Sequence, residues 1–169
     1  MAVLSGNDIR RLIKRQPPLI EGWIDLDTQV QANGFDLTLR DIAVMESDGQ
    51  ITVDNRQRAL SGLSPLAFDA AGYITLAAGI YMITYNEIVH LPKDVMALGR
   101  PRSSLLRCGV NVGTAVWDAG YEGRSQSLLI VHNPQGFRVQ RNARITQLVF
   151  MTLTGESEGY NGIYQGENI

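Results

Sequence analysis

Arg102, Ser103, Ser104 and Arg107 place two guanidinium groups and two hydroxyls in one short segment. A guanidinium group makes bidentate contacts to phosphate, and serine hydroxyls and backbone N–H groups add further donors. If Ser103–Arg107 opens a short helix, its N-terminus adds free N–H groups that face an anion. The segment favours a phosphate-binding site over the alternative, a capped helix with solvated arginines.

A second segment, Val116–Gly123, places Asp118 after an apolar run and before Gly120, Tyr121 and Gly123. This order predicts a tight hairpin that presents Asp118 and Tyr121 on one loop. A carboxylate on a rigid turn can act as a general base toward water, and a tyrosine ring offers a flat face to a sugar or a base. From these residues alone, an ordinary Asp–Gly turn remains the alternative.

Other kinds of chemistry and several kinds of partner are disfavoured. Two histidines and one cysteine, Cys108, cannot supply the His/Cys/Cys zinc set of nucleoside deaminases, and a lone cysteine does not indicate a nucleophile. The formal charge of -2 gives no net attraction for nucleic acid or anionic lipid. The given residues open without a charged-then-apolar pattern and contain no apolar run near ~18 residues, and one cysteine allows no intrachain disulfide. We expect a cytoplasmic protein with neither a nucleic-acid nor a membrane partner.

The elements that must position these segments are mainly strands. Ser5–Asp8 predicts a helix start, and Ile9, Leu12 and Ile13 then share one helical face until Pro17 and Pro18 end the helix. After this helix, short apolar runs alternate with Gly, Asn, Asp or Pro roughly every 8 to 12 residues, which is typical of an all-β sandwich or barrel. The expected strands are 23–26, 35–45, 51–53, 73–76, 80–85, 88–91, 95–98, 126–132, 137–140 and 145–153. The stretch 56–71 predicts an irregular loop or a short helix.

The chain length suits one domain, which we place at residues 1–155, followed by a tail at 156–169. From residue 154 onward, glycines alternate with Tyr160, Asn161, Tyr164 and Gln165. This stretch has too little apolar content to pack as an element of its own. It predicts a flexible tail that becomes ordered on binding and closes over the active site, with simple terminal fraying as the alternative.

Four segments in sequence order resemble motifs one to four of the trimeric dUTPase and dCTP deaminase superfamily. These segments are Gly34–Leu37, Arg102–Leu105, Val116–Gly123 and Arg144–Phe150. The opening Leu4–Ile9 and the closing Tyr164–Gly166 are similar to the deaminase branch. The resemblance implies a distorted β jelly roll and a homotrimer with active sites between subunits. It also implies a dUTP diphosphatase that forms dUMP and pyrophosphate, thereby limiting uracil in DNA and supplying dUMP for dTMP synthesis.

The resemblance assigns roles to residues on the nucleoside side of such a site. Asp118 would deprotonate the water that attacks the α-phosphate. Tyr121 would pack on the deoxyribose and leave no room for a 2′-hydroxyl, with Val116 and Trp117 beside it in the deoxyribose and base pocket. Backbone groups of Asn111–Trp117 would read the base.

On the phosphate side, the resemblance implies that Arg102, Ser103 and Ser104 of a neighbouring subunit hold the phosphates together with Gln147. Asp36 would reach Mg²⁺ through water, because the triphosphate itself chelates most of the metal. Further phosphate or base contacts are expected from four other residues: Arg107, Tyr160, Tyr164 and Gln165.

One position separates the two activities of the superfamily. Its deaminases use no zinc and rely on a glutamate ten residues after the motif-three aspartate, with a serine and an arginine that Ser103 and Arg107 match. Here that position is Leu128, and leucine cannot accept or shuttle a proton. We therefore expect no deamination. A dCTP deaminase, with one or both activities, is one alternative. A catalytically silent nucleotide-binding protein is the other, and the presence of Asp118 argues against it.

Two features depart from the ordinary dUTPase pattern. The tail lacks the arginine of the glycine-rich fifth motif, so Tyr160 or Tyr164 is expected to stack on the nucleotide. Glu122 stands where a basic or neutral residue is common in relatives. Since an acid would repel a triphosphate, we expect Glu122 to point away from the site.

Overall fold

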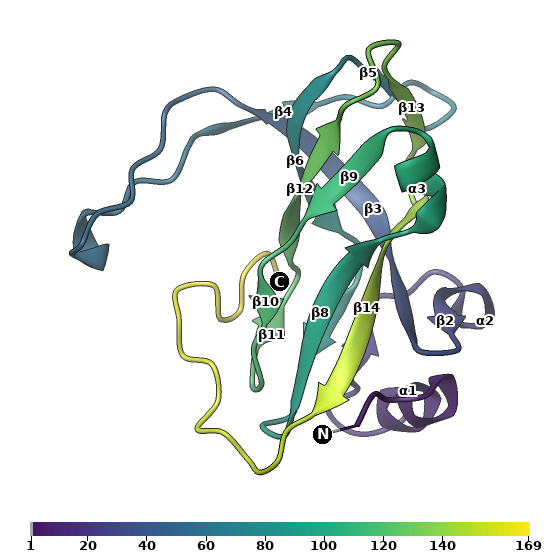
Figure 1. Ribbon diagram of the computed structural model, residues 1–169, viewed down its shortest axis with the longest axis vertical. Helices are drawn as coiled ribbons and strands as arrows, with labels where there is room; N and C mark the ends of the chain where they lie inside the picture. Colours follow the sequence, from purple (N-terminus) through teal and green to yellow (C-terminus); the bar gives the residue numbers. More distant parts are fainter. Residues whose placement is uncertain (1) are drawn as a thin grey trace.

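The computed structural model describes residues 2–169, and most of its elements are antiparallel strands (Figure 1). The helices are short: α1 (Gly6–Ile13), α2 (Leu26–Gln29), α3 (Ser103–Arg107) and a 3-10 turn, η1 (Asn55–Gln57). The strands of the first half are β1 (Ile20–Glu21), β2 (Val30–Gln31), β3 (Gly34–Met45), β4 (Leu63–Leu66), β5 (Tyr73–Leu76), β6 (Gly79–Tyr85) and β7 (Ile88–His90). Those of the second half are β8 (Val95–Pro101), β9 (Val110–Gly113), β10 (Val116–Trp117), β11 (Glu122–Gly123), β12 (Gln126–Val131), β13 (Phe137–Gln140) and β14 (Arg144–Thr152).

The strands form curled antiparallel sheets. The largest runs in the order β10-β8-β14-β3-β6-β12-β9, with β2 and β4 also paired to β3. A small sheet runs β1-β7-β11, and β13 pairs with β5. The all-β class and the distorted jelly roll predicted from the sequence are confirmed. Within the described residues, no helix is long and apolar enough to cross a membrane.

Strand β3 runs through the centre of the molecule, and residues 34–39 in its first half are buried on both faces. Phe35, Leu37 and Leu39 lie on one face and are fully buried in the hydrophobic core. Because side chains alternate along a strand, Asp36 and Thr38 are buried on the other face. Buried polar groups need partners. Thr38 Oγ1 donates to the buried Glu87 (2.6 Å), whose second carboxylate oxygen accepts from Thr38 N (2.9 Å).

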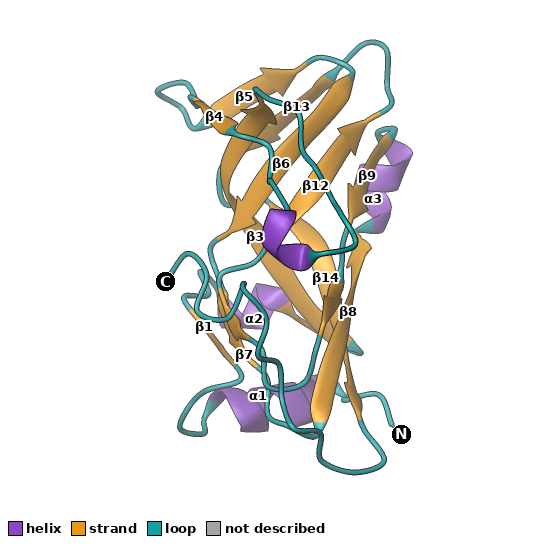
Figure 2. Cartoon of the chain, turned by 90° about the vertical axis from the view of Figure 1, so that its left-hand side faces the viewer, coloured by secondary structure: helices purple, strands orange, loops and turns teal. Residues whose placement is uncertain are grey.

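Helix α1 lies at the end of the molecule opposite β5 and β13 (Figures 1 and 2). The Ser5 hydroxyl accepts from Asp8 N, and the Asp8 carboxylate accepts from Ser5 N, which completes the predicted capping box. Ile9 and Leu12 are buried, as their spacing predicted. The helix ends at Ile13, ahead of the two prolines.

Residues 46–62 form an arm that leaves the body between β3 and β4 (Figure 1). An isolated bridge joins Gln50 and Ala59 across it, while Ile51, Val53 and Leu60 are exposed. The predicted strand at 51–53 is therefore wrong: this stretch has no neighbouring strand with which to pair. The weakly patterned stretch 56–71 contains the end of η1 and strand β4.

A second predicted strand, 23–26, is also wrong. Asp25 ends the extended chain there, because its side chain accepts from Asp27 N and Thr28 N and caps α2. The sequence analysis also missed β1, β2, β4, β9, β10 and β11, which are short or lie in segments with weak alternation.

The tail after β14 folds back along the body and passes β10 and β11 (Figure 1). Ser157 N donates to Lys93 O, Tyr160 N to Ala119 O, and Arg124 N to Glu167 O. The tail therefore docks on its own chain through backbone hydrogen bonds, and Tyr160 packs against the hydrophobic core. That it is mobile before a ligand binds stays a prediction.

Candidate functional site

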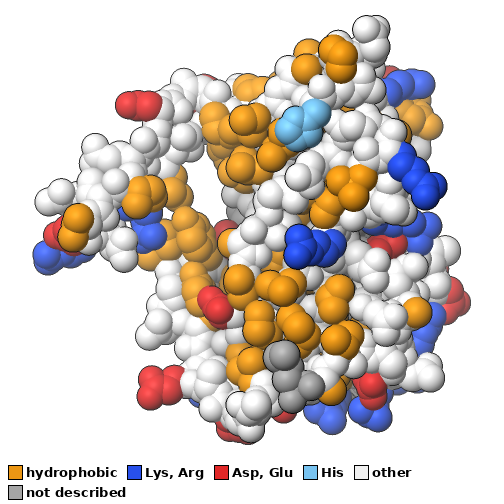
Figure 3. All heavy atoms as spheres, in the orientation of Figure 1, with side chains coloured by type: hydrophobic (Ala, Val, Ile, Leu, Met, Phe, Trp, Pro, Cys, Tyr) orange, Lys and Arg blue, Asp and Glu red, His pale blue; other side chains and the backbone are white. Residues whose placement is uncertain are grey.

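A cavity of about 980 Å³ opens between the base of the arm, strands β9 to β12 and the tail. Its volume is at the upper end of ordinary ligand pockets, so a nucleotide fits. Met45, Leu60 and Leu63 line it on the arm side. In Figure 3, hydrophobic side chains gather around the hollow beside the arm.

Asp118 lies exposed on a tight turn at the rim of this cavity. Tyr121 N donates to Asp118 O (3.0 Å), and Gly120 has a φ of 83°. A Cβ on Gly120 would lie 2.7 Å from Gly159 Cα, so the turn and the docked tail both require glycine there. Within residues 2–169, no hydrogen bond or ion pair occupies the Asp118 carboxylate. It is thus available to a water molecule or a ligand.

The predicted hairpin is wrong in one respect. Strands β10 and β11, on either side of the turn, do not pair with each other: β10 pairs with β8, and β11 pairs with β7. The turn therefore bridges two sheets, which fixes both of its ends. Asp118 and Tyr121 still share one loop, as predicted.

Tyr121 and Trp117 form a buried wall of the cavity, while Val116 lines it as an exposed side chain. Burial raises the pKa of the Tyr121 hydroxyl above its ordinary value, so Tyr121 stays neutral. The Tyr160 ring of the tail meets the Tyr121 ring edge-on, with 5.7 Å between ring centres. These aromatic rings give the cavity flat apolar surfaces of the kind that suit a sugar or a base.

Leu128 on β12 also lines the cavity, next to Gln126 and Ser127. It is partly buried, and it pairs with Met82 on one side and Gly113 on the other. The position at which the resemblance would place a deaminase glutamate therefore faces the cavity, and here it presents a hydrocarbon side chain.

The tail contributes Tyr160, Tyr164 and Glu167 to the cavity lining. Gln165 does not line it. Instead, Gln165 Nε2 donates to Gly120 O (3.1 Å), and Gln165 Oε1 accepts from Glu122 N (3.1 Å). Gln165 therefore binds the backbone of the turn, and its contact with a nucleotide stays a prediction.

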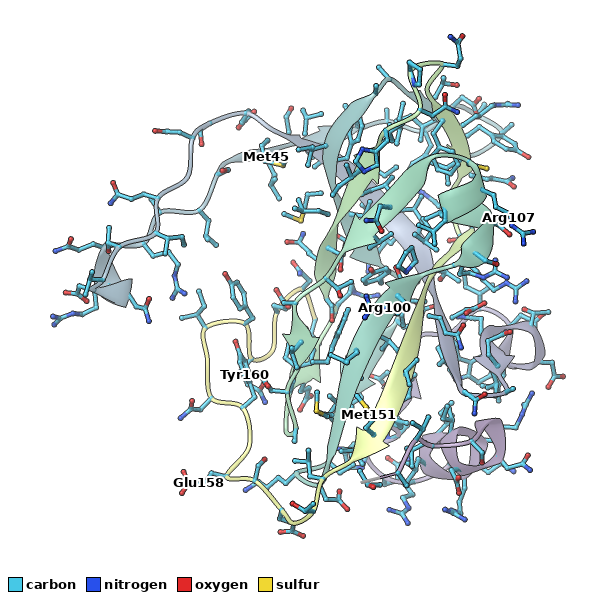
Figure 4. All side chains as sticks on the ribbon, in the orientation of Figure 1. Met45, Arg100, Arg107, Met151, Glu158 and Tyr160 are labelled. Atoms are coloured by element: carbon cyan, nitrogen blue, oxygen red, sulfur yellow. The ribbon has the colours of Figure 1, made fainter. Side chains whose placement is uncertain are left out.

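The phosphate-side residues lie elsewhere. The short helix considered at Ser103–Arg107 is present as α3, with Arg102 at its N-cap. Ser103, Ser104 and Arg107 are exposed, and none of them lines the cavity. Figure 4 shows Arg107 on the side of the molecule opposite Tyr160. In one chain, these donors face away from Asp118.

Asp36 is held in a buried ion-pair cluster with Arg102 and Arg144. Its Oδ2 lies 2.9 Å from Arg102 Nε and 3.4 Å from Arg144 Nη1, and its side chain is 1% exposed. Burial raises the pKa of Asp36, although both arginines oppose this rise. Gln147 lies opposite Asp36 on β14, and a Cβ on Gly34 would lie 2.8 Å from Gln147 Nε2. Gly34 thus leaves room for the Gln147 side chain.

A magnesium ion fits this set of residues only with ligands from elsewhere. In the part of the chain that the structure describes, no three His, Cys, Asp or Glu side chains gather as a metal site. Asp36 Oδ1 is buried, however, and has no hydrogen-bond partner in that part of the chain. A carboxylate oxygen in this state can accept a hydrogen bond from a metal-bound water. The residues fit a metal that substrate oxygens chelate and that Asp36 contacts through water.

The predicted residues therefore separate into two groups. Six line the cavity: Val116, Trp117, Asp118, Tyr121, Tyr160 and Tyr164. Seven lie outside its lining: Asp36, Arg102, Ser103, Ser104, Arg107, Gln147 and Gln165. Glu122 also lies outside, and its Oε1 is 3.3 Å from His90 Nδ1.

Five polar residues of the cavity were not predicted from the sequence: Ser61, Ser125, Gln126, Ser127 and Glu167. The sequence analysis also missed the apolar residues that the arm and β6 contribute, such as Leu60 and Met82. Ser125 lies just beyond motif three, so its position close to Tyr121 could have indicated it. Nothing in the sequence indicates that Glu167 meets Tyr121.

Curated relatives match the chain over nearly its full length. A "Probable deoxyuridine 5′-triphosphate nucleotidohydrolase" of Methanosarcina mazei is 52% identical, covering 99% of this chain and 99% of the relative. A relative of the same name in Archaeoglobus fulgidus is 50% identical, covering 100% and 99%. The "Deoxyuridine 5′-triphosphate nucleotidohydrolase" of Methanocaldococcus jannaschii is 35% identical, covering 83% and 89%.

Among solved structures, the 2′-deoxycytidine 5′-triphosphate deaminase of Agrobacterium tumefaciens superposes with a TM-score of 0.65 at 24% identity. The match covers 88% of this chain and 47% of that chain, and it supports the fold alone. The family model described as dCTP deaminase-like matches residues 3–153. With the four motifs placed on this fold, the chain belongs to the dCTP deaminase-like family.

Proposed function

We propose that the protein is a homotrimeric dUTP diphosphatase that uses magnesium to convert dUTP to dUMP and pyrophosphate. The observation that carries the proposal is the free carboxylate of Asp118 at the rim of a nucleotide-sized cavity, beside Tyr121. Relatives that are about half identical over the whole chain are named for dUTP hydrolysis, which supports the same substrate here.

In the proposed reaction, Asp118 accepts a proton from a water molecule while the oxygen of that water bonds to the α-phosphorus. The bond from the α-phosphorus to the α–β bridging oxygen breaks, and pyrophosphate leaves with that oxygen. Positioning of the water by a fixed carboxylate lowers the barrier without a covalent intermediate. Magnesium, when bound to the phosphates, would neutralise charge on the leaving group.

Arg102, Ser103, Ser104 and Gln147 would complete the site from a neighbouring subunit. In one chain, they lie outside the cavity that holds Asp118. In a cyclic trimer the same interface repeats between neighbouring chains. The Asp118 side of one chain can therefore meet the Arg102 side of the next, although the two sides face apart within each chain. When a triphosphate binds, the Arg102 guanidinium would either break its ion pair with Asp36 or contact the phosphates and Asp36 together.

A deaminase of the same family is the second candidate, because the fold of a known dCTP deaminase is similar. Leu128 argues against it. It lines the cavity at the deaminase glutamate position, and no proton can be transferred there. Residual binding of dCTP as an inhibitor is compatible with this arrangement. The cytoplasmic location expected from the sequence stays a prediction.

One incubation tests the proposal: dUTP, dCTP, dTTP and UTP, each with magnesium, with the products separated by chromatography. We expect dUMP and pyrophosphate from dUTP, and no ammonia from dCTP. Ammonia from dCTP would favour the deaminase. Binding of dUTP without any product would favour the silent nucleotide-binding protein.

A further inference from the structure

Four polar groups form a continuous hydrogen-bonded chain in the wall of the cavity. Trp117 Nε1 lies 2.6 Å from Ser125 Oγ, Ser125 Oγ lies 3.1 Å from Tyr121 Oη, and Tyr121 Oη lies 2.7 Å from Glu167 Oε1. All four residues line the cavity. They come from β10, the turn, the loop before β12 and the tail, so the chain joins the tail to the body.

The direction of each hydrogen bond follows from its ends. An indole N–H can only donate, so Ser125 Oγ accepts from Trp117. At the other end, Tyr121 donates its single hydrogen to Glu167. Tyr121 Oη can therefore only accept from Ser125, whose own hydrogen is free to donate. Each hydroxyl hydrogen of these four groups is donated in one hydrogen bond. Removal of Glu167 therefore leaves the Tyr121 hydroxyl without its acceptor.

The buried part of this chain has no ready substitute for Glu167. Trp117, Tyr121 and Ser125 are 5%, 6% and 5% exposed, while Glu167 is partly exposed. A buried hydroxyl that loses its acceptor carries a free-energy cost. Tyr121 would then be expected to turn or to admit water.

The backbone places Glu167 at this point. Gly166 N donates to Glu122 O, Arg124 N donates to Glu167 O, and an isolated parallel bridge joins Gly123 to Glu167. A Cβ on Gly123 would lie 2.6 Å from Tyr121 Oη and 3.1 Å from Glu167 Cγ. Glycine at 123 therefore leaves the space in which the hydroxyl and the carboxylate meet.

We infer that Glu167 is a positioning residue for the nucleoside part of the site. Glu167 accepts a hydrogen bond from the Tyr121 hydroxyl and thereby fixes the ring that would lie against the deoxyribose. Docking of the tail and the shape of the sugar pocket are therefore coupled. This inference rests on the proposed function for its substrate. The coupling itself is a property of the protein without nucleotide.

The first test uses Glu167→Ala and Glu167→Gln, with Glu158→Gln as a matched control. Glu158 is an exposed tail residue for which the described structure shows no side-chain partner, and it is labelled in Figure 4. Glu167→Ala should lower kcat/KM for dUTP by on the order of tenfold, mainly through KM, and should reduce the preference for dUTP over UTP. Glu167→Gln keeps an acceptor oxygen, so it should recover most of the kcat/KM for dUTP and most of the preference for dUTP over UTP. The Glu158→Gln control should match the wild type.

The second test separates the inference from the proposed function, because it needs no substrate. Amide hydrogen exchange at Arg124 and Gly166, which donate across the junction of tail and body, should accelerate in Glu167→Ala and in Tyr121→Phe. The double variant should exchange no faster than the single variants, since both remove one interaction. Unchanged exchange in both single variants would overturn the inference, as would an unchanged ratio of dUTP to UTP in an active Glu167→Ala enzyme.

Discussion

The cavity wall and the Asp36 cluster use polar side chains in opposite ways. In the wall, Trp117, Ser125, Tyr121 and Glu167 satisfy one another and leave Asp118 free. In the cluster, Arg102 and Arg144 turn inward to Asp36, while Ser103 and Ser104 face solvent. The wall is complete within one chain. The cluster neutralises a buried charge and lies outside the cavity that holds Asp118, as expected of a half-site that a neighbouring subunit would complete.

Loss of the free carboxylate should give the largest effect. Asp118→Asn keeps the size of the side chain but removes the base, so turnover of dUTP should fall on the order of 10²–10⁴-fold. Binding of a non-hydrolysable dUTP analogue, measured by calorimetry, should be largely retained. Near wild-type turnover of the variant would show that the wall contributes binding only.

Mixed trimers test whether the two regions meet across subunits. Asp118→Asn and Arg102→Ala chains, each poorly active alone, should regain activity after joint unfolding and refolding. With random assembly of equal amounts, about a quarter of the sites would combine two intact halves. If both halves of a site came from one chain, mixing would restore nothing.

Arg102 also neutralises Asp36, so Arg102→Ala is expected to destabilise the fold as well as the site. A second variant on the phosphate side therefore serves as a control. A chain with Ser103→Ala and Ser104→Ala changes only exposed hydroxyls.

Light scattering of the unmixed proteins should give about three times the 18.6 kDa chain mass. A fully active monomer would contradict the half-site interpretation.

The wall can also be changed at Leu128. Leu128→Glu introduces a group that can transfer protons at the deaminase position, so slow release of ammonia from dCTP is expected, measured by an enzyme-coupled assay. Leu128→Gln is the matched control, because it is equally large and polar but cannot serve as an acid or a base. Equal ammonia release from both variants, or from the wild type, would refute the argument from this position.

The smallest expected effect is the response of the tail to pH. Burial raises the pKa of Glu167 in the docked tail, and the hydrogen bond from Tyr121 only partly opposes this rise. A carboxyl group with a raised pKa favours docking fully below its undocked pKa, and this contribution is lost as the pH rises through the docked value. The protection factor of the Gly166 amide, which is the ratio of its intrinsic to its measured exchange rate at each pH, should therefore fall over that interval in the wild type. Glu167→Gln should remove the dependence, and an equal response in that variant would assign it to another group.

Sequence reasoning succeeded where the pattern is local. Residues 35–45 alternate strongly, and β3 covers them with one residue added at its start. The N-terminal helix was also predicted, because its cap and its apolar period are visible in the residues themselves. Sequence reasoning failed at 51–53, where an apolar run has no strand beside it, and at 23–26, where Asp25 starts a helix.

For the candidate site, the four motifs named most of the predicted residues, and the resemblance already assigned Arg102, Ser103 and Ser104 to a neighbouring subunit. The positions of Asp118 and Tyr121 on one turn could be predicted, because only two residues separate them. The pairing of β10 with β8 and of β11 with β7 could not, since it depends on distant strands. The meeting of Tyr121 with Glu167 was equally hidden, because the glycine-rich tail gives no period from which its path can be predicted.

The arm at residues 46–62 is separable from the fold. Strands β3 and β4 stay paired from Ile42 opposite Leu66 to Met45 opposite Leu63, so the core closes below the arm without help from it. Changing the length of a surface connection costs little free energy, because loop-closure entropy varies slowly with length. The arm is therefore a place where insertions and deletions can accumulate, or where a foreign loop can be grafted, while the jelly roll is preserved. Since Leu60 lines the cavity, a shortened or replaced arm would alter one wall of the pocket without touching Asp118 or Tyr121.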